Sequence, residues 1–334
     1  MPEKIDTCVI GGSAGSLTAL KQILPHLPKD LPMAILVCRH VTSAEDGVSA
    51  SLLQRHTELP VQVARDGMPV RQGQIIVAPP GMHLMLGSDH VHLRMGAHEN
   101  NFRPAIDPLF RSAAIYRASR AVGVILSGLL NDGASGARAM ARTGGSIIAQ
   151  DPATAEFPAM PKAAMDAVPE AVAVSLDQIG ATLIDIAGTI AAPAPPIPKD
   201  IGIELKIAAM EGANMETEAK LGELSPLNCP HCNGVLWEIK DGPLLRFRCH
   251  TGHAYTAEAL SEEQNEMLDR GLFDTLRAHR GRIHLLQRLA KRAEPRARKA
   301  FEERVSLVEE DAERLEQIIV NRAVADTGVE RPYD

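Results

Sequence analysis

The sequence is poor in aromatic side chains, which make up 3% of its 334 residues. Its cores must therefore be built mainly from alanine, valine, isoleucine, leucine and methionine. The chain has no apolar run of about 18 residues and no charged-then-apolar stretch at its start, so neither a membrane-spanning helix nor a secretory signal is predicted. The net charge of −7 argues against a general role in binding nucleic acid or membranes. We expect a cytoplasmic protein with no nucleic-acid partner and no direct membrane insertion.

Cysteine is also scarce, with five in the chain. Cys8 and Cys38 lie within apolar runs, and we interpret them as buried thiols. The other three, Cys229, Cys232 and Cys249, form a C-x-x-C pattern followed by a third cysteine. In a cytosolic protein such a cluster indicates metal binding rather than disulfides.

The first half of the chain alternates short apolar runs with helical patterns. Continuous apolar runs separated by helices predict an α/β fold with a doubly wound, mainly parallel sheet covered on both faces. Residues 83–86 and 90–94 flank a G-S-D turn and predict a β-hairpin appended to this core. The apolar runs are residues 7–10, 33–38, 74–78, 121–126 and 145–149.

The composition divides the chain into four parts. Residues 191–198 are rich in proline and predict a linker. From residue 256 to 324 the pattern is helical and is interrupted at Pro295, which predicts an antiparallel helical hairpin. The expected parts are an α/β domain (1–188), a linker and connecting segment (189–224), a zinc-ribbon-like unit (225–256) and a helical hairpin with a tail (257–334).

Two short strands joined by a turn, with cysteines at their outer ends, predict the zinc-ribbon-like unit. The spacing C-x2-C-x16-C-x3-H is typical of structural zinc. A hairpin this small is only marginally stable without a cross-link such as a bound metal. We therefore expect zinc bound by Cys229, Cys232, Cys249 and His253. His250 is an alternative fourth ligand, and a thiol-bearing hairpin without metal is the alternative to the site as a whole.

A glycine-rich turn follows the first apolar run and precedes a helical pattern. A dinucleotide loop, as in a nucleotide-binding oxidoreductase, requires G-x-G-x-x-G, whereas residues 11–16 read G-G-S-A-G-S and lack two of the glycines. The same stretch fits the nucleophile elbow G-x-S-x-G, which would present the hydroxyl of Ser13. The alternative role for Ser13 is that of an N-cap of the helix.

Two further polar residues follow predicted strands. His40 comes directly after the run that ends at Cys38, and Asp132 follows the run that ends at Leu126. Active groups of an open α/β sheet collect at the carboxyl ends of its strands. We therefore expect a nucleophile, a base and an orienting acid in Ser13, His40 and Asp132. A structural role for His40 and a helix cap for Asp132 are the alternatives.

At these residues the sequence resembles the catalytic domain of the chemotaxis methylesterase family (CheB), over residues 5–185. The resemblance implies a protein-glutamate methylesterase that hydrolyses methyl esters on chemoreceptors and also deamidates receptor glutamines. It carries the catalytic triad over to Ser13, His40 and Asp132, with no cofactor needed for catalysis. Its motifs are at residues 10–15, 38–41, 76–83, 103–112, 123–133, 149–151 and 160–161.

Three features depart from the usual family pattern. No receiver domain fits before residue 5, so a stand-alone form is expected. Ala14 stands where the family commonly has threonine, and Leu130 stands where it has a second glycine. Backbone N–H groups near Ser13 and at Leu129 are the expected oxyanion donors. The expected partner is a methylated chemoreceptor or receptor-like signalling protein, and the alternative function is a regulatory or scaffold homologue acting through its C-terminal region.

Overall fold

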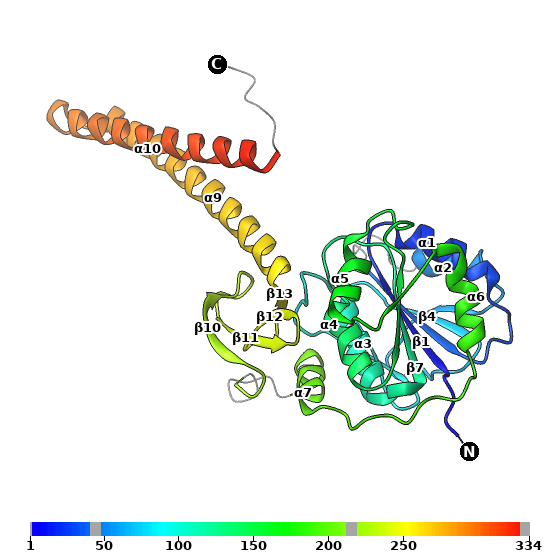
Figure 1. Cartoon of the computed structure of the whole chain (residues 1–334). Coiled ribbons are helices and arrows are strands. Elements are labelled where there is room, and N and C mark those ends of the chain that lie inside the picture. The colour runs from blue at the N-terminus through cyan, green and yellow to red at the C-terminus, as the bar shows by residue number, and fades with distance from the viewer. Residues whose placement is uncertain (1, 41–47, 212–218, 328–334) are drawn as a thin grey trace. The chain divides into compact units, whose positions relative to one another are not determined.

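The computed structural model describes residues 2–40, 48–211 and 219–327 (Figure 1). The chain forms two compact units, Met1–Leu260 and Ser261–Asp334. The first unit holds a seven-stranded sheet, a two-stranded hairpin and a four-stranded antiparallel sheet. None of the described helices is both long and apolar enough to cross a membrane.

The seven-stranded sheet confirms the predicted fold class. Its order is β3-β4-β2-β1-β7-β8-β9, and all its neighbouring strands pair in parallel. Five strands coincide with the apolar runs, whereas the edge strands β3 and β9 are only three residues long and partly exposed, so no apolar run marks them. The strands are β1 (Thr7–Gly12), β2 (Ala34–Arg39), β3 (Val61–Val63), β4 (Gln74–Val77), β7 (Ala121–Ile125), β8 (Ser146–Gln150) and β9 (Val172–Val174).

Helices cover both faces of this sheet, as Figure 1 shows. Side chains alternate between the faces, so that Val9 packs in one apolar core and Cys8 and Ile10 in the other. One face carries α3 (Ile106–Tyr116), α4 (Ala134–Arg142) and α5 (Ala159–Ala167). The other carries α1 (Ser16–Ile23), α2 (Val48–Gln54) and α6 (Leu176–Ile186), and short 3₁₀ turns follow at η1 (Leu24–His26) and η3 (Ala118–Arg120).

The predicted hairpin is present as the antiparallel pair β5 (His83–Leu86) and β6 (Val91–Arg94). After the proline-rich stretch, the connecting segment forms helix α7 (Lys199–Ala208). Another part of that segment, residues 212–218, lies outside the described residues.

The four-stranded antiparallel sheet contains the predicted pair of strands at its centre, β11 (Val235–Asp241) and β12 (Leu244–Cys249). The flanking strands β10 (Glu223–Asn228) and β13 (Ala254–Thr256) were not predicted from the sequence. The strand β13 has only three residues, so its pairing with β12 is not visible as a pattern in the sequence.

The C-terminal region is helical, as predicted. Arg322 bonds Asp269 at 3.0 Å and Arg280 bonds Glu316 at 2.8 Å, so residue numbers rise along one helix as they fall along the other. The helices are therefore antiparallel. They are α9 (Ala257–Arg292), which begins in the first unit, and α10 (Pro295–Thr327).

Candidate active site and metal-binding cluster

The three predicted catalytic residues meet at the carboxyl edge of the parallel sheet. β1 pairs with β2 on one side and with β7 on the other, so the chain reverses its direction of travel across the sheet at β1. Ligand sites of open α/β sheets form at such a switch point. Ser13 follows β1, His40 follows β2, and Asp132 lies between β7 and α4.

The turn that carries Ser13 depends on its glycines. Gly15 has φ 77°, and a Cβ there would lie 2.6 Å from the Ser127 Oγ. A Cβ on Gly12 would lie 2.5 Å from the Ser16 Cβ. Larger residues would therefore open this sharp turn. The N-cap of α1 is Gly15, without a side-chain hydrogen bond, so the alternative role of Ser13 as the helix N-cap is wrong.

Two hydrogen bonds connect the three side chains. The Ser13 Oγ lies 3.1 Å from His40 Nδ1, and His40 Nε2 lies 2.7 Å from Asp132 Oδ2. The His40 and Asp132 side chains are only 4% and 1% exposed. With its proton on Nε2, donated to Asp132, His40 would turn the free lone pair of Nδ1 toward the serine hydroxyl. The Phe102 ring stacks on the imidazole, with the ring centroids 3.4 Å apart.

Asp132 is held as a buried anion by several donors. Its Oδ2 also accepts the Ile106 N–H at 2.7 Å, and its Oδ1 accepts from Asn100 Nδ2 and the Gly133 N–H at 3.0 Å each. Burial alone would raise the pKa of Asp132, but the hydrogen bond and charge of His40, and the Ile106 N–H, hold that pKa below its ordinary value. The carboxylate is therefore charged at neutral pH.

A second buried carboxyl group, Asp107, serves the start of α4. Its Oδ1 accepts the N–H groups of Gly133 and Gly136 at 3.1 and 2.7 Å. The N-cap residue of α4 is Gly133, and the side chain that accepts an N–H group within the first turn of α4 is that of Asp107, not that of Asp132. Burial, followed by the negative charge of Asp132, raises the pKa of Asp107 above its ordinary value.

Three residues of the site were not predicted individually from the sequence, namely Asn100, Phe102 and Asp107. Asp107 lies within a family motif, and that motif was the available signal for it. Asn100 and Phe102 act through contacts with residues distant in sequence, for which no local pattern exists.

Two backbone N–H groups beside the expected oxyanion site already have acceptors. The Ser13 N–H donates to the Ser127 carbonyl and the Gly128 N–H to the Phe157 carbonyl, each at 3.0 Å. Neither group is therefore available to an incoming oxyanion. Leu130, close by, has φ 59°, a left-handed conformation at the position where the family has glycine.

The four predicted metal ligands lie together in the antiparallel sheet. The ligand atoms of Cys229, Cys232, Cys249 and His253 are all within 4.8 Å of one another. The Sγ atoms of Cys232 and Cys249 are 3.6 Å apart, and Cys249 Sγ lies 3.4 Å from His253 Nδ1. Three sulfurs and one imidazole at this spacing fit tetrahedral zinc. The cluster contains His253, whereas the ring of the alternative ligand His250 packs against Gly234.

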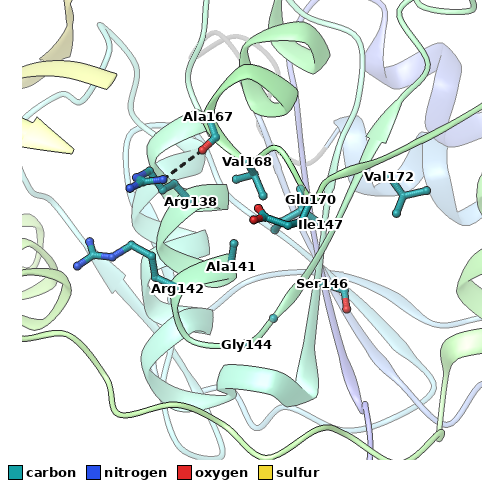
Figure 2. A pocket seen from close by; sticks show the side chains of 11 residues that line it. Arg138, Ala141, Arg142, Gly144, Ser146, Ile147, Ala167, Val168, Glu170 and Val172 are labelled. Atoms are coloured by element: carbon teal, nitrogen blue, oxygen red, sulfur yellow. Dashed lines mark hydrogen bonds between the residues drawn. The ribbon is translucent and has the colours of Figure 1, made fainter. Parts of the chain in front are cut away.

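A cavity of about 550 Å³ lies away from both sites, at the amino end of β8 (Figure 2). Two arginines line it, but both are already paired. Arg138 Nε bonds Asp241 at 2.9 Å, and Arg142 bonds Asp200 at 2.6 Å. None of the predicted site residues lines this cavity, and its paired arginines do not form an open anion site.

A serine bonded to a histidine, and that histidine to an aspartate, is the order of the serine-hydrolase triad, with the two imidazole nitrogens exchanged here relative to the common template. A family model described as CheB methylesterase matches residues 8–183, which is slightly more than half of the chain. The chain therefore belongs to the CheB methylesterase family, as the sequence resemblance predicted.

Individual relatives cover the same region. A protein of Leptospira interrogans (serogroup Icterohaemorrhagiae, serovar copenhageni, strain Fiocruz L1-130) is 34% identical over 180 residues, which are 54% of this chain and 93% of that protein. The protein-glutamate methylesterase/protein-glutamine glutaminase 2 of Anaeromyxobacter dehalogenans (strain 2CP-C) is 38% identical over 49% of this chain and 48% of its own length.

The same region is similar to a solved structure. The crystal structure of the Thermotoga maritima CheB methylesterase catalytic domain matches with a TM-score of 0.53 and 32% identity. The match covers 55% of this chain and all of that domain.

Proposed function

We propose that this protein hydrolyses glutamate methyl esters on a chemoreceptor or receptor-like signalling protein, and also deamidates receptor glutamines. The observation that carries the proposal is the pair of hydrogen bonds from Ser13 to His40 and from His40 to Asp132. The names of the relatives, as methylesterases and glutaminases, support the choice of substrate.

Acylation begins when His40 Nδ1 accepts the proton of the Ser13 hydroxyl. The serine oxygen bonds to the γ-carbonyl carbon of the ester, and the carbonyl oxygen becomes an oxyanion. Backbone N–H groups of the turn between Ser13 and α1, and of Leu129, stabilise that charge. The C–O bond to the methoxy group then breaks, His40 returns the proton to the leaving oxygen, and methanol departs.

Deacylation repeats these steps with water. His40 takes a proton from a water molecule, whose oxygen attacks the acyl carbon. The bond to the Ser13 oxygen breaks, the serine recovers its proton from His40, and a glutamate side chain is released. Asp132 remains charged throughout and stabilises the imidazolium that forms in each half. With glutamine as the substrate, the leaving group is ammonia.

Methanol release from methylated receptors tests the proposal. We expect Ser13→Ala to reduce turnover about 10,000-fold or more, because the nucleophile is lost. Ser88→Ala is the matched control, since Ser88 is an exposed residue beside the β5–β6 hairpin. Turnover by Ser13→Ala equal to that of wild type would exclude the mechanism.

We also propose that Cys229, Cys232, Cys249 and His253 bind one structural zinc ion. The ion would cross-link the ends of the antiparallel sheet and supply no step of the reaction. Elemental analysis should find about one equivalent of zinc for one four-ligand site. Less than half an equivalent would reject it.

The remaining assignments are proposals of the same kind. We propose the four parts 1–188, 189–224, 225–256 and 257–334, and a cytoplasmic location. Ala14 and Leu130 favour a second candidate function, a regulatory or scaffold homologue with a weakened site. Wild-type methanol release no faster than that of Ser13→Ala would favour this second candidate.

A further inference from the structure

We infer that the four-stranded antiparallel sheet is part of the catalytic centre. In this inference Asn100 is a positioning residue that holds Asp132 and is itself held by β13. The inference rests on the proposed Ser-His-Asp mechanism. In it the antiparallel sheet positions Asp132 by hydrogen bonds and supplies no group that reacts with the substrate.

The backbone of residues 98–100 pairs with Ala254, the first residue of β13. The Asn100 N–H donates to the Ala254 carbonyl at 2.8 Å, and the Ala254 N–H donates to the His98 carbonyl at 3.3 Å. Just beyond this pairing, Phe102 stacks on the His40 ring. The segment 98–102 therefore contacts the antiparallel sheet through its backbone and the catalytic base through a side chain.

The Asn100 side chain connects the same two regions. Its Oδ1 accepts the Thr256 backbone N–H at 3.0 Å, and its Nδ2 donates to Asp132 Oδ1 and Asp107 Oδ2 at 3.0 Å each. Asn100 is 2% exposed, so water does not replace these partners. Because the Thr256 N–H requires an acceptor, β13 determines which end of the amide faces the two carboxyl groups.

A second asparagine connects β13 with the residue next to Asp132. The Thr256 hydroxyl donates to Asn131 Oδ1 at 2.6 Å, and Asn131 Nδ2 donates to Glu258 Oε2 at 2.6 Å. Both polar ends of Asn131 are thus held by residues that follow the metal-binding cluster. Asp132 is consequently fixed from two directions by the same short stretch of chain.

Buried ion pairs keep the antiparallel sheet against this segment. Arg248 on β12 is fully buried and bonds Glu99 and Glu204, each at 3.1 Å. Glu99 also pairs with Arg111 on α3, and it directly precedes Asn100. Separating these partners would leave a buried charge uncompensated, which is strongly unfavourable. The position of the sheet and the position of Asn100 are therefore linked.

This linkage has a catalytic consequence. Without the Asn100 amide, Asp132 loses one donor, and only the Gly133 N–H is left to bridge it to Asp107. The His40 imidazole, which Asp132 orients, is then held less firmly. Loss of a hydrogen bond to a charged group corresponds to about a 10- to 100-fold loss in rate if it acts fully in the transition state.

The test measures labelling of Ser13 by a fluorophosphonate, which reports an activated serine without a receptor substrate. Full-length wild type, Asn100→Ala, Thr256→Val and Thr256→Ser are compared, and Ser13→Ala defines the background. Asn228→Ala, at an exposed position of β10, is the matched control. We expect labelling about 10- to 100-fold slower for Asn100→Ala and about 10-fold slower for Thr256→Val. Thr256→Ser keeps the hydroxyl and should restore the wild-type rate.

A second measurement needs no reaction. The His40 Nε2–H that is donated to Asp132 should give a downfield proton resonance, and Asn100→Ala and Thr256→Val should shift or broaden it. Circular dichroism identifies folded variants. Thr256→Val keeps the backbone N–H that Asn100 accepts and removes the hydroxyl bond to Asn131, so it tests the second link between β13 and Asp132 even if Asn100→Ala does not fold. Wild-type labelling and an unchanged resonance in a folded Asn100→Ala protein would overturn the role of Asn100. The same result in a folded Thr256→Val protein would overturn the support that β13 gives through Asn131. Absence of Ser13 labelling in wild type would instead contradict the proposed function, and the resonance alone then decides the inference.

Discussion

The substitution Asp132→Asn is the sharpest test of the catalytic geometry, because it changes charge and hydrogen bonding but hardly any volume. All five bonds to the carboxylate come from donors. Whichever way an asparagine amide turns, its NH2 group therefore faces other donors. Those facing Oδ1 are Asn100 Nδ2, Asp107 N and Gly133 N, and those facing Oδ2 are His40 Nε2 and Ile106 N.

The amide oxygen should turn toward the side with three donors, which leaves its NH2 group against His40 Nε2. His40 must then carry its proton on Nδ1, the nitrogen that lies 3.1 Å from the Ser13 Oγ. No lone pair remains to accept the serine proton. We expect turnover to fall about 10,000-fold, as the equivalent change does in another serine hydrolase. The buried N–H groups that then lack an acceptor should lower the free energy of unfolding by about 1 to 3 kcal/mol.

Methanol release gives the turnover, and urea unfolding gives the stability. Asp166→Asn is the matched control, since Asp166 is exposed on α5. A folded Asp132→Asn protein with turnover within tenfold of wild type would refute the reasoning, because His40 would then act without the carboxylate.

Three further predictions concern other parts of the first unit. The pKa of Asp107 is higher in the folded protein than in the unfolded chain. The free energy of unfolding of wild type should therefore fall, relative to that of Asp107→Asn, as the pH rises from about 4 to the folded pKa. Urea unfolding across this pH range checks the sign. Leu130→Gly should be better tolerated than Leu129→Gly by about 1 kcal/mol in thermal unfolding, because only Leu130 has a positive φ of the two. Equal losses would show that the left-handed conformation carries no strain. His253→Ala should lose bound zinc by elemental analysis whereas His250→Ala should keep it, and the reverse result would exchange their roles.

The sheet and the three catalytic candidates were accessible from the sequence because both depend on local order. An apolar run followed by a turn marks the end of a strand, and parallel strands bring such ends together. Ser13, His40 and Asp132 each follow a run of this kind. The hydrogen bonds among them span 27 and 92 residues, but the rule needs only the position of each strand.

The support around Asp132 was not accessible in the same way. Asn100 lies in a loop and has a φ of 49°. Its hydrogen bond to Thr256 spans 156 residues of the sequence. Neither periodicity nor spacing relates two residues so far apart. The strand pattern with zinc-type spacing predicted the central hairpin of the small antiparallel sheet, but the surface on which that sheet packs depends on which charges meet there. That information appears only when Glu99, Glu204 and Arg248 are seen together.

The same ion pairs favour specificity of docking over stability. Arg246 and Arg248 both bond Glu204, and all three side chains are almost fully buried. Their desolvation opposes much of the attraction, and neither Arg246 Nε nor Arg248 Nε has a hydrogen-bond partner among the described residues. A well-packed apolar contact would be at least as stable, but it would allow the antiparallel sheet to shift along the surface on which it packs. Charges that must meet in one register hold β12 in one position, and β13 is paired with β12. Asn100 and Asp132 require this fixed position of β13.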